Sequence, residues 1–123
     1  MKGRILLVED DSALREALSD VLVEMGYEVM SAPDGLEGLS LAVEQEEPCP
    51  IVLDWRMPLV DGPEFLARLR RLPRGGEFPV ILASGDQAAA RNELGEDVTV
   101  VLSKPFDLAA LVAALDRVAT RAS

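Results

Sequence analysis

The sequence predicts an α/β fold, a doubly wound five-stranded parallel sheet with helices on both faces. Five short apolar runs alternate with longer segments whose apolar residues recur at helical spacing. The runs are almost continuously aliphatic, which is typical of parallel strands that are covered on both faces. The chain has 123 residues, 49% of them hydrophobic and 28% charged. This size and composition predict a single globular domain over residues 1–123.

The first strand and helix follow from the spacing of apolar residues. Residues 5–8 form the first apolar run. From Leu14 to Met25, apolar residues occur at i, i+3, i+4, i+7, i+8 and i+11, which predicts a helix with one buried face. Gly26 is expected to end this helix, because glycine takes the left-handed cap conformation without strain.

The second strand and helix are expected at the edge of the sheet. The strand over 28–32 is short and half polar. Asp34 then has the position of an N-cap, with a glutamate three residues later, as in a capping box. We expect the helix to run to about residue 46, with Leu36, Leu39 and Val43 facing inward.

The third strand and helix repeat this arrangement. Residues 51–54 form an aliphatic run that ends at an aspartate. Asp61 is expected to cap a helix whose buried side carries Phe65, Leu66, Leu69 and Leu72. The glycines and prolines of residues 73–79 then predict a loop.

The last part of the chain supplies two more strands, over 80–83 and 98–102. Residues 87–94 predict a short, alanine-rich helix between them. The final helix is expected to begin near Asp107, and its apolar positions are Leu108, Leu111, Val112, Leu115 and Val118.

For five parallel strands with right-handed crossovers, the natural strand order is the flavodoxin-like order 2-1-3-4-5. Ligands of such sheets bind beyond the carboxyl ends of the strands, at the switch point between the first and third strands. Four of the five predicted strands deliver a chemically useful group to this edge, in the order Glu9 and Asp10, Asp54, Ser84, and Lys104.

The carboxylates of this group predict a cation site. Neighbouring strands lie about 4.8 Å apart, so Asp10 and Asp54 are expected to approach closely, with Glu9 beside them. Two carboxylates ~4 Å apart repel by ~4 kcal/mol at an effective dielectric constant near 20. Oxygen ligands without histidine or cysteine favour Mg²⁺, Mn²⁺ or Ca²⁺. Mg²⁺ fits best, because it binds few carboxylates and accepts phosphate oxygens as further ligands.

Composition excludes several functions. The chain has no histidine, which excludes Ser-His-Asp and Cys-His catalysis, histidine-ligated metals and a phosphohistidine. The net charge of −10 argues against direct binding of nucleic acid. Cys49 is the single cysteine, expected to be a small buried hydrophobe, and a reducing compartment is the natural expectation. We find no membrane-span or signal-peptide pattern and expect a cytoplasmic protein.

Four motifs together resemble the response regulator receiver domain of two-component signalling systems. They are "ILLVEDD" at the first strand, "VLDWRMP" followed by "DG" at the third, "ILASG" at the fourth and "SKPF" at the fifth. Each is weak alone, but all four in this order are highly specific, and the resemblance covers essentially the whole chain.

The resemblance implies that Asp54 accepts a phosphoryl group from a sensor histidine kinase or a phosphotransfer protein. It also implies a Mg²⁺ ion held by Asp10, Asp54 and the backbone carbonyl of Arg56, with Glu9 assisting through water. Ser84 and Lys104 would bind the phosphoryl oxygens. The domain would act as a signalling switch for an unknown downstream effector protein rather than as an enzyme with an external substrate, although it would promote its own phosphorylation and dephosphorylation.

The sequence departs from the family pattern at Val101, where the family usually carries an aromatic residue. The stretch from Ser84 to Lys104 is also somewhat short. These two departures leave an alternative open, a degenerate receiver that binds proteins without phosphorylation. We also expect the chain to be either a stand-alone receiver or one cut from a larger protein, such as a hybrid kinase. A phosphatase of the dehalogenase type would need a second aspartate two residues after Asp54, where this chain has Arg56.

Overall fold

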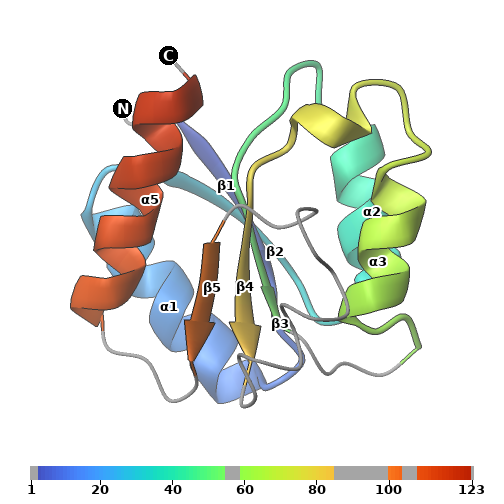
Figure 1. Cartoon of the computed structure of the whole chain (residues 1–123). Helices are drawn as coiled ribbons and strands as arrows, with labels where there is room; N and C mark the ends of the chain where they lie inside the picture. Colours follow the sequence, from blue (N-terminus) through green and yellow to red (C-terminus); the bar gives the residue numbers. More distant parts are fainter. Residues whose placement is uncertain (1–2, 55–58, 85–99, 104–107, 123) are drawn as a thin grey trace.

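The computed structural model describes residues 3–54, 59–84, 100–103 and 108–122. They contain a parallel sheet with the strand order β2-β1-β3-β4-β5 (Figure 1). Its strands are β1 (Arg4–Val8), β2 (Glu28–Ala32), β3 (Ile51–Asp54), β4 (Val80–Ser84) and β5 (Val100–Ser103). The predicted order is confirmed, and β2 is an edge strand as its half-polar sequence indicated.

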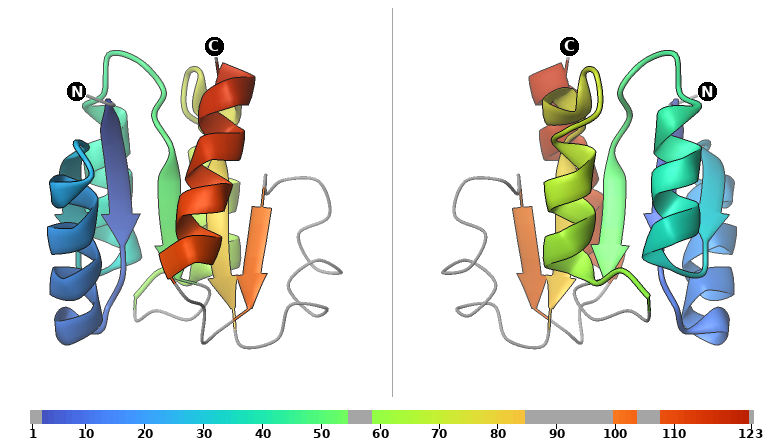
Figure 2. Two further views of the ribbon diagram at one scale, coloured as in Figure 1. Left: turned by 90° about the vertical axis from the view of Figure 1, so that its left-hand side faces the viewer. Right: turned by 90° about the vertical axis from the view of Figure 1, so that its right-hand side faces the viewer.

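Helices lie on both faces of the sheet, as predicted. They are α1 (Ser12–Glu24), α2 (Gly35–Val43), α3 (Gly62–Leu69) and α5 (Leu108–Ala122), and a 3₁₀ turn, η1 (Gly75–Glu77), precedes β4. Helices α1 and α5 cover one face, and α2 and α3 cover the other (Figure 2). The short helix predicted over 87–94 lies outside the described residues. None of the helices described has the length and hydrophobicity needed to cross a membrane.

The core consists of two layers, one on each face of the sheet. In β1, Ile5 and Leu7 belong to the layer under α1 and α5, whereas Leu6 and Val8 belong to the layer under α2 and α3. All four residues are at most 1% exposed. Both faces of the strand are therefore buried, which explains why the strands read as continuous aliphatic runs instead of alternating with polar residues.

The predicted helix boundaries have clear physical causes. Asp34 Oδ1 accepts a hydrogen bond from the backbone N–H of Glu37 at 2.8 Å, and Asp61 Oδ1 accepts one from Glu64 at 3.0 Å. Both aspartates therefore satisfy an otherwise unpaired amide of the first helical turn. After α1, Gly26 has φ 103°, in the left-handed region that favours glycine.

The prediction for the inward face of α2 is wrong at Leu36 and Val43, which are 46% and 62% exposed. Leu39 faces inward as predicted, because it packs against the core, although it is only partly buried. The buried residues of α2 are instead the small ones, Gly35, Gly38 and Ala42.

Close packing is the reason for this reversal. A Cβ on Gly38 would lie 2.9 Å from Cγ2 of Val8 and 3.1 Å from Cε2 of Phe65. Because both neighbours are fully buried, a large side chain at Gly38 has no room. The helix therefore turns its glycines toward the sheet and α3. Leu36 and Val43 face solvent, whereas Leu39 and Leu41 pack against the core only in part. The helix also ends at Val43, a little earlier than expected.

Candidate metal centre

Strand register brings the predicted acidic residues to one level at the carboxyl edge of the sheet. Val8 of β1 pairs with Leu53 of β3, so that Glu9, the next residue, comes level with Asp54. Asp54 in turn pairs with Ala83 of β4. This edge is the switch point between β1 and β3, where the chain leaves neighbouring strands toward opposite faces of the sheet.

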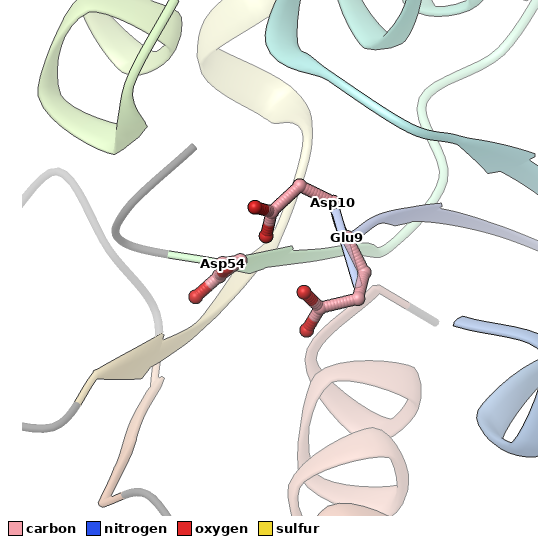
Figure 3. Close-up of side chains that lie close together, drawn as sticks. All are labelled: Glu9, Asp10 and Asp54. Carbon is pink, nitrogen blue, oxygen red and sulfur yellow. The ribbon is translucent and has the colours of Figure 1, made fainter. Parts of the chain in front are cut away.

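Glu9, Asp10 and Asp54 converge there. Each offers a carboxylate oxygen, and these oxygens all lie within 4.8 Å of one another. Glu9 and Asp10 extend from the end of β1 and Asp54 from the end of β3, toward a shared space (Figure 3). Glu9 is 4% and Asp54 6% exposed, whereas Asp10 is exposed to solvent. The predicted approach of the three carboxylates is confirmed.

The loop that carries Glu9 and Asp10 is tied to its surroundings by hydrogen bonds. The backbone N–H of Glu9 donates to the carbonyl of Ala32 in β2 at 3.1 Å. The Glu9 carbonyl accepts a hydrogen bond from Nη1 of Arg15 at 2.9 Å, and Glu9 Oε2 accepts one from the backbone N–H of Asp11 at 3.1 Å. Asp11 itself caps α1 by accepting from the amides of Ala13 and Leu14.

This set of ligands fits a hard divalent cation. At an effective dielectric constant near 20, two unit charges 4.8 Å apart repel by about 3.5 kcal/mol. Three carboxylates this close together, two of them buried, therefore favour the binding of a cation. Carboxylate oxygens are the ligands that Mg²⁺ and Ca²⁺ prefer. The chain has no histidine, and Cys49 precedes the first residue of β3 whereas Asp54 is its last, so the ligands argue against zinc. The side chains present therefore fit the expected Mg²⁺.

Of the other predicted site residues, Ser84 lies at the same edge. Ser84 is the last residue of β4 and pairs with Ser103 of β5, one position beyond the level of Asp54. Lys104 follows Ser103 in the sequence, but Lys104 and Arg56 lie outside the described residues. Arg15 was not among the residues that the sequence singled out, because an arginine in the first turns of a helix has no pattern that separates it from a solvent-exposed one.

Comparison with known proteins agrees with this geometry. Residues 5–116 match the family model of the response regulator receiver domain. The chain is 32% identical over 120 residues to a probable chemotaxis protein CheY of Rhizobium etli, an alignment that covers 95% of this chain and 92% of that protein. It is 36% identical over 115 residues to the DNA-binding dual master transcriptional regulator RpaA of Synechocystis, with 89% of this chain and only 46% of the regulator covered.

Solved structures of receiver domains share the fold. The receiver domain of sensor histidine kinase PA1611 from Pseudomonas aeruginosa, whose active-site cleft coordinates a magnesium ion, superposes with a TM-score of 0.85 at 28% identity. The superposition covers 95% of this chain and 97% of that one. Fold, acidic cluster and sequence relatives all lead to one conclusion: this chain belongs to the family of response regulator receiver domains of two-component systems.

Proposed function

We propose that this receiver domain takes a phosphoryl group onto Asp54 in a Mg²⁺-dependent reaction, with a phosphohistidine of a sensor kinase or phosphotransfer protein as the donor. The observation that carries the proposal is the convergence of Glu9, Asp10 and Asp54 within 4.8 Å at the end of a buried parallel strand. A buried strand aims a nucleophile more precisely than a loop does.

In the transfer, a carboxylate oxygen of Asp54 forms a bond to phosphorus while the bond between phosphorus and the donor imidazole nitrogen breaks. The electron pair of the broken bond stays on the imidazole, which takes up a proton. Asp10, Asp54 and the carbonyl of Arg56 would hold the Mg²⁺ ion, with Glu9 acting through water. When bound, the ion neutralises charge on the phosphoryl oxygens and the carboxylates.

We assign Ser84 and Lys104 to the phosphoryl oxygens. The pairing of Ser84 with Ser103 supports this, because it brings the ends of β4 and β5 to the edge where Asp54 lies. A serine hydroxyl can donate one hydrogen bond to the transferred group, and a lysine ammonium can neutralise part of its charge. Their contact with the phosphoryl group would couple phosphorylation to the surface that an effector protein recognises.

The charge distribution supports protein partners for this stretch of chain. Residues 16–55 contain ten aspartates and glutamates and no lysine or arginine, whereas acidic and basic residues balance in the rest of the chain. The whole net charge of −10 therefore comes from the part that forms most of α1, β2 and α2. An acidic surface repels the phosphate backbone of nucleic acids, so we propose that DNA contact, where a regulator of this family makes it, lies outside this domain.

The test uses acetyl phosphate as a small phosphoryl donor and measures the intact mass of the protein. We expect the mass of one phosphoryl group to be added with MgCl₂ present, and not with EDTA. Asp54→Asn should abolish the addition, whereas Asp61→Asn, which keeps the cap of α3, should leave it intact. Beryllofluoride with Mg²⁺ should also change the fluorescence of Trp55, the single tryptophan, which neighbours Asp54 in sequence.

The alternative of a degenerate receiver makes the opposite prediction. If the wild-type protein gains no phosphoryl group and shows no response of Trp55 to beryllofluoride, the domain works without phosphorylation and the assignment of Asp54 is wrong. If Asp54→Asn is still phosphorylated, the phosphoryl group is accepted by a carboxylate other than Asp54.

A further inference from the structure

We infer that Arg15 is a positioning residue for the metal centre: its guanidinium holds the carbonyl of Glu9 and so fixes the direction in which Asp10 presents its carboxylate. The contact joins Nη1 of Arg15, in the first turns of α1, to an acceptor just beyond β1, at 2.9 Å. This inference rests on the proposed Mg²⁺ site and concerns how the chain prepares its ligands for that ion.

The acidic loop needs such a contact because it lies beyond the sheet. Asp54 is part of β3 and is held by its pairing with Ala83. Glu9 and Asp10 follow the last residue of β1, where the ladder between β1 and β3 has ended. Metal ligands on a loop are held less precisely than ligands on a strand unless neighbouring groups fix them.

The planarity of the peptide bond explains why the carbonyl of Glu9 is the atom to hold. That carbonyl and the N–H of Asp10 belong to one rigid peptide plane, which also contains the Cα of Asp10. The hydrogen bond from Arg15 therefore fixes the orientation of this plane and, with it, the direction of the Asp10 side chain. The preceding amide, the N–H of Glu9, is bonded to Ala32 of β2 at 3.1 Å. Together the two bonds anchor the loop to β2 on one side and to α1 on the other.

The position of Arg15 also suggests a purely electrostatic role, and the two roles predict opposite results. A positive charge near the carboxylates opposes the entry of a cation, so removing the charge alone would tighten the binding of any divalent ion. In the described part of the chain, Arg15 donates to a carbonyl and makes no ion pair with a carboxylate. This geometry favours a role in orientation.

Comparison of two ions separates orientation from charge. Mg²⁺ requires near-ideal octahedral geometry with short bonds, whereas Ca²⁺ accepts longer bonds and irregular arrangements. Because the ions carry the same charge, a change in the electrostatic potential shifts both affinities by a similar factor. A loss of ligand orientation weakens Mg²⁺ binding more than Ca²⁺ binding.

The experiment is a calorimetric titration of the wild-type protein and its variants with MgCl₂ and, separately, with CaCl₂. We expect Arg15→Met to raise the Kd for Mg²⁺ by about tenfold, the scale of losses when a group that orients metal ligands is removed, and to raise the Kd for Ca²⁺ by a smaller factor. Arg15→Lys, which keeps the charge and one donor, should recover part of the Mg²⁺ affinity. Arg71→Met, the loss of an exposed arginine after α3, controls for the change in net charge.

The inference is overturned if Arg15→Met binds Mg²⁺ as well as or better than the wild type, or if both affinities change by the same factor. Circular dichroism in EDTA checks that each variant is folded. Should Arg15→Met fail to fold, the ratio of Mg²⁺ to Ca²⁺ affinity in Arg15→Lys decides, and a ratio equal to that of the wild type refutes the inference. A wild-type protein that binds no Mg²⁺ would refute the metal centre itself, an outcome distinct from indifference to Arg15.

Discussion

Replacing Asp10 by asparagine should stabilise the metal-free protein while it removes the response to Mg²⁺. The oxygens of Asp10, Glu9 and Asp54 lie within 4.8 Å of one another. Each pair of charges at that separation repels by about 0.9 kcal/mol at the dielectric constant of water and about 3.5 kcal/mol at an effective value of 20. The substitution removes the two pairs that include Asp10.

The sum over two pairs is about 2–7 kcal/mol by the same relation, and the exposure of Asp10 to solvent places the expected gain near the lower end, at about 2 kcal/mol. The assay is urea-induced unfolding in EDTA and again in excess MgCl₂. In EDTA, the midpoint of unfolding should lie at a higher urea concentration for Asp10→Asn than for the wild type. In MgCl₂ the wild type should gain stability because the ion binds only the folded state, and the variant should gain little.

Asp11→Asn is the matched control, since it removes the same charge from the neighbouring residue. Asp11 caps α1, and asparagine is an equally good cap, so we expect a small change in stability and an intact response to Mg²⁺. If Asp10→Asn is less stable than the wild type in EDTA, repulsion does not dominate the cluster and the electrostatic argument for the metal centre fails.

Three further predictions concern the packing around the site. Gly38→Ala should destabilise the fold by about 1 kcal/mol in urea unfolding, because the clash of its Cβ with Val8 costs more than the gain in helix propensity. Leu36→Ser with Val43→Ser should lower the free energy of unfolding by no more than about 1 kcal/mol in total, since about half or more of each residue is exposed. Burial raises the pKa of Cys49 to about 11, so this thiol should react with Ellman's reagent at pH 8 only as fast as the protein opens. The stabilisation that comes from burying the neutral thiol is complete below the ordinary thiol pKa of about 9 and should be lost as the pH rises toward 11. Urea unfolding across that pH range measures this loss.

Each of these outcomes has a clear opposite. If the urea midpoint of Gly38→Ala is unchanged or higher than that of the wild type, α2 can move away from the sheet without a loss of stability. A loss of several kcal/mol in the double serine variant would restore the inward orientation first expected for those side chains. Rapid labelling of Cys49 in the folded protein would contradict its burial.

The sequence alone determined the alternation of strands and helices, the strand order and the edge at which the functional groups gather. These features depend on local signals, because aliphatic runs, apolar spacing and capping residues such as Asp34 and Asp61 act within a few neighbouring residues. Parallel strands with right-handed crossovers then leave few possible topologies. Because the few possible topologies make the first and third strands neighbours, the sequence also placed Glu9 and Asp10 beside Asp54 at one edge of the sheet.

Only the tertiary structure decided which face of α2 is buried and which groups hold the acidic loop. The leucines of α2 have the spacing of a buried face, but a Cβ at Gly38 would already lie 2.9 Å from Val8 and 3.1 Å from Phe65, which leaves no room for a leucine on that face. The hydrogen bond from Arg15 to the carbonyl of Glu9 likewise joins a side chain to a backbone atom. Such a bond cannot be predicted from residue type or spacing, because every residue has a backbone carbonyl. Both depend on distances between elements, and those distances are set when the whole core packs at crystal-like density.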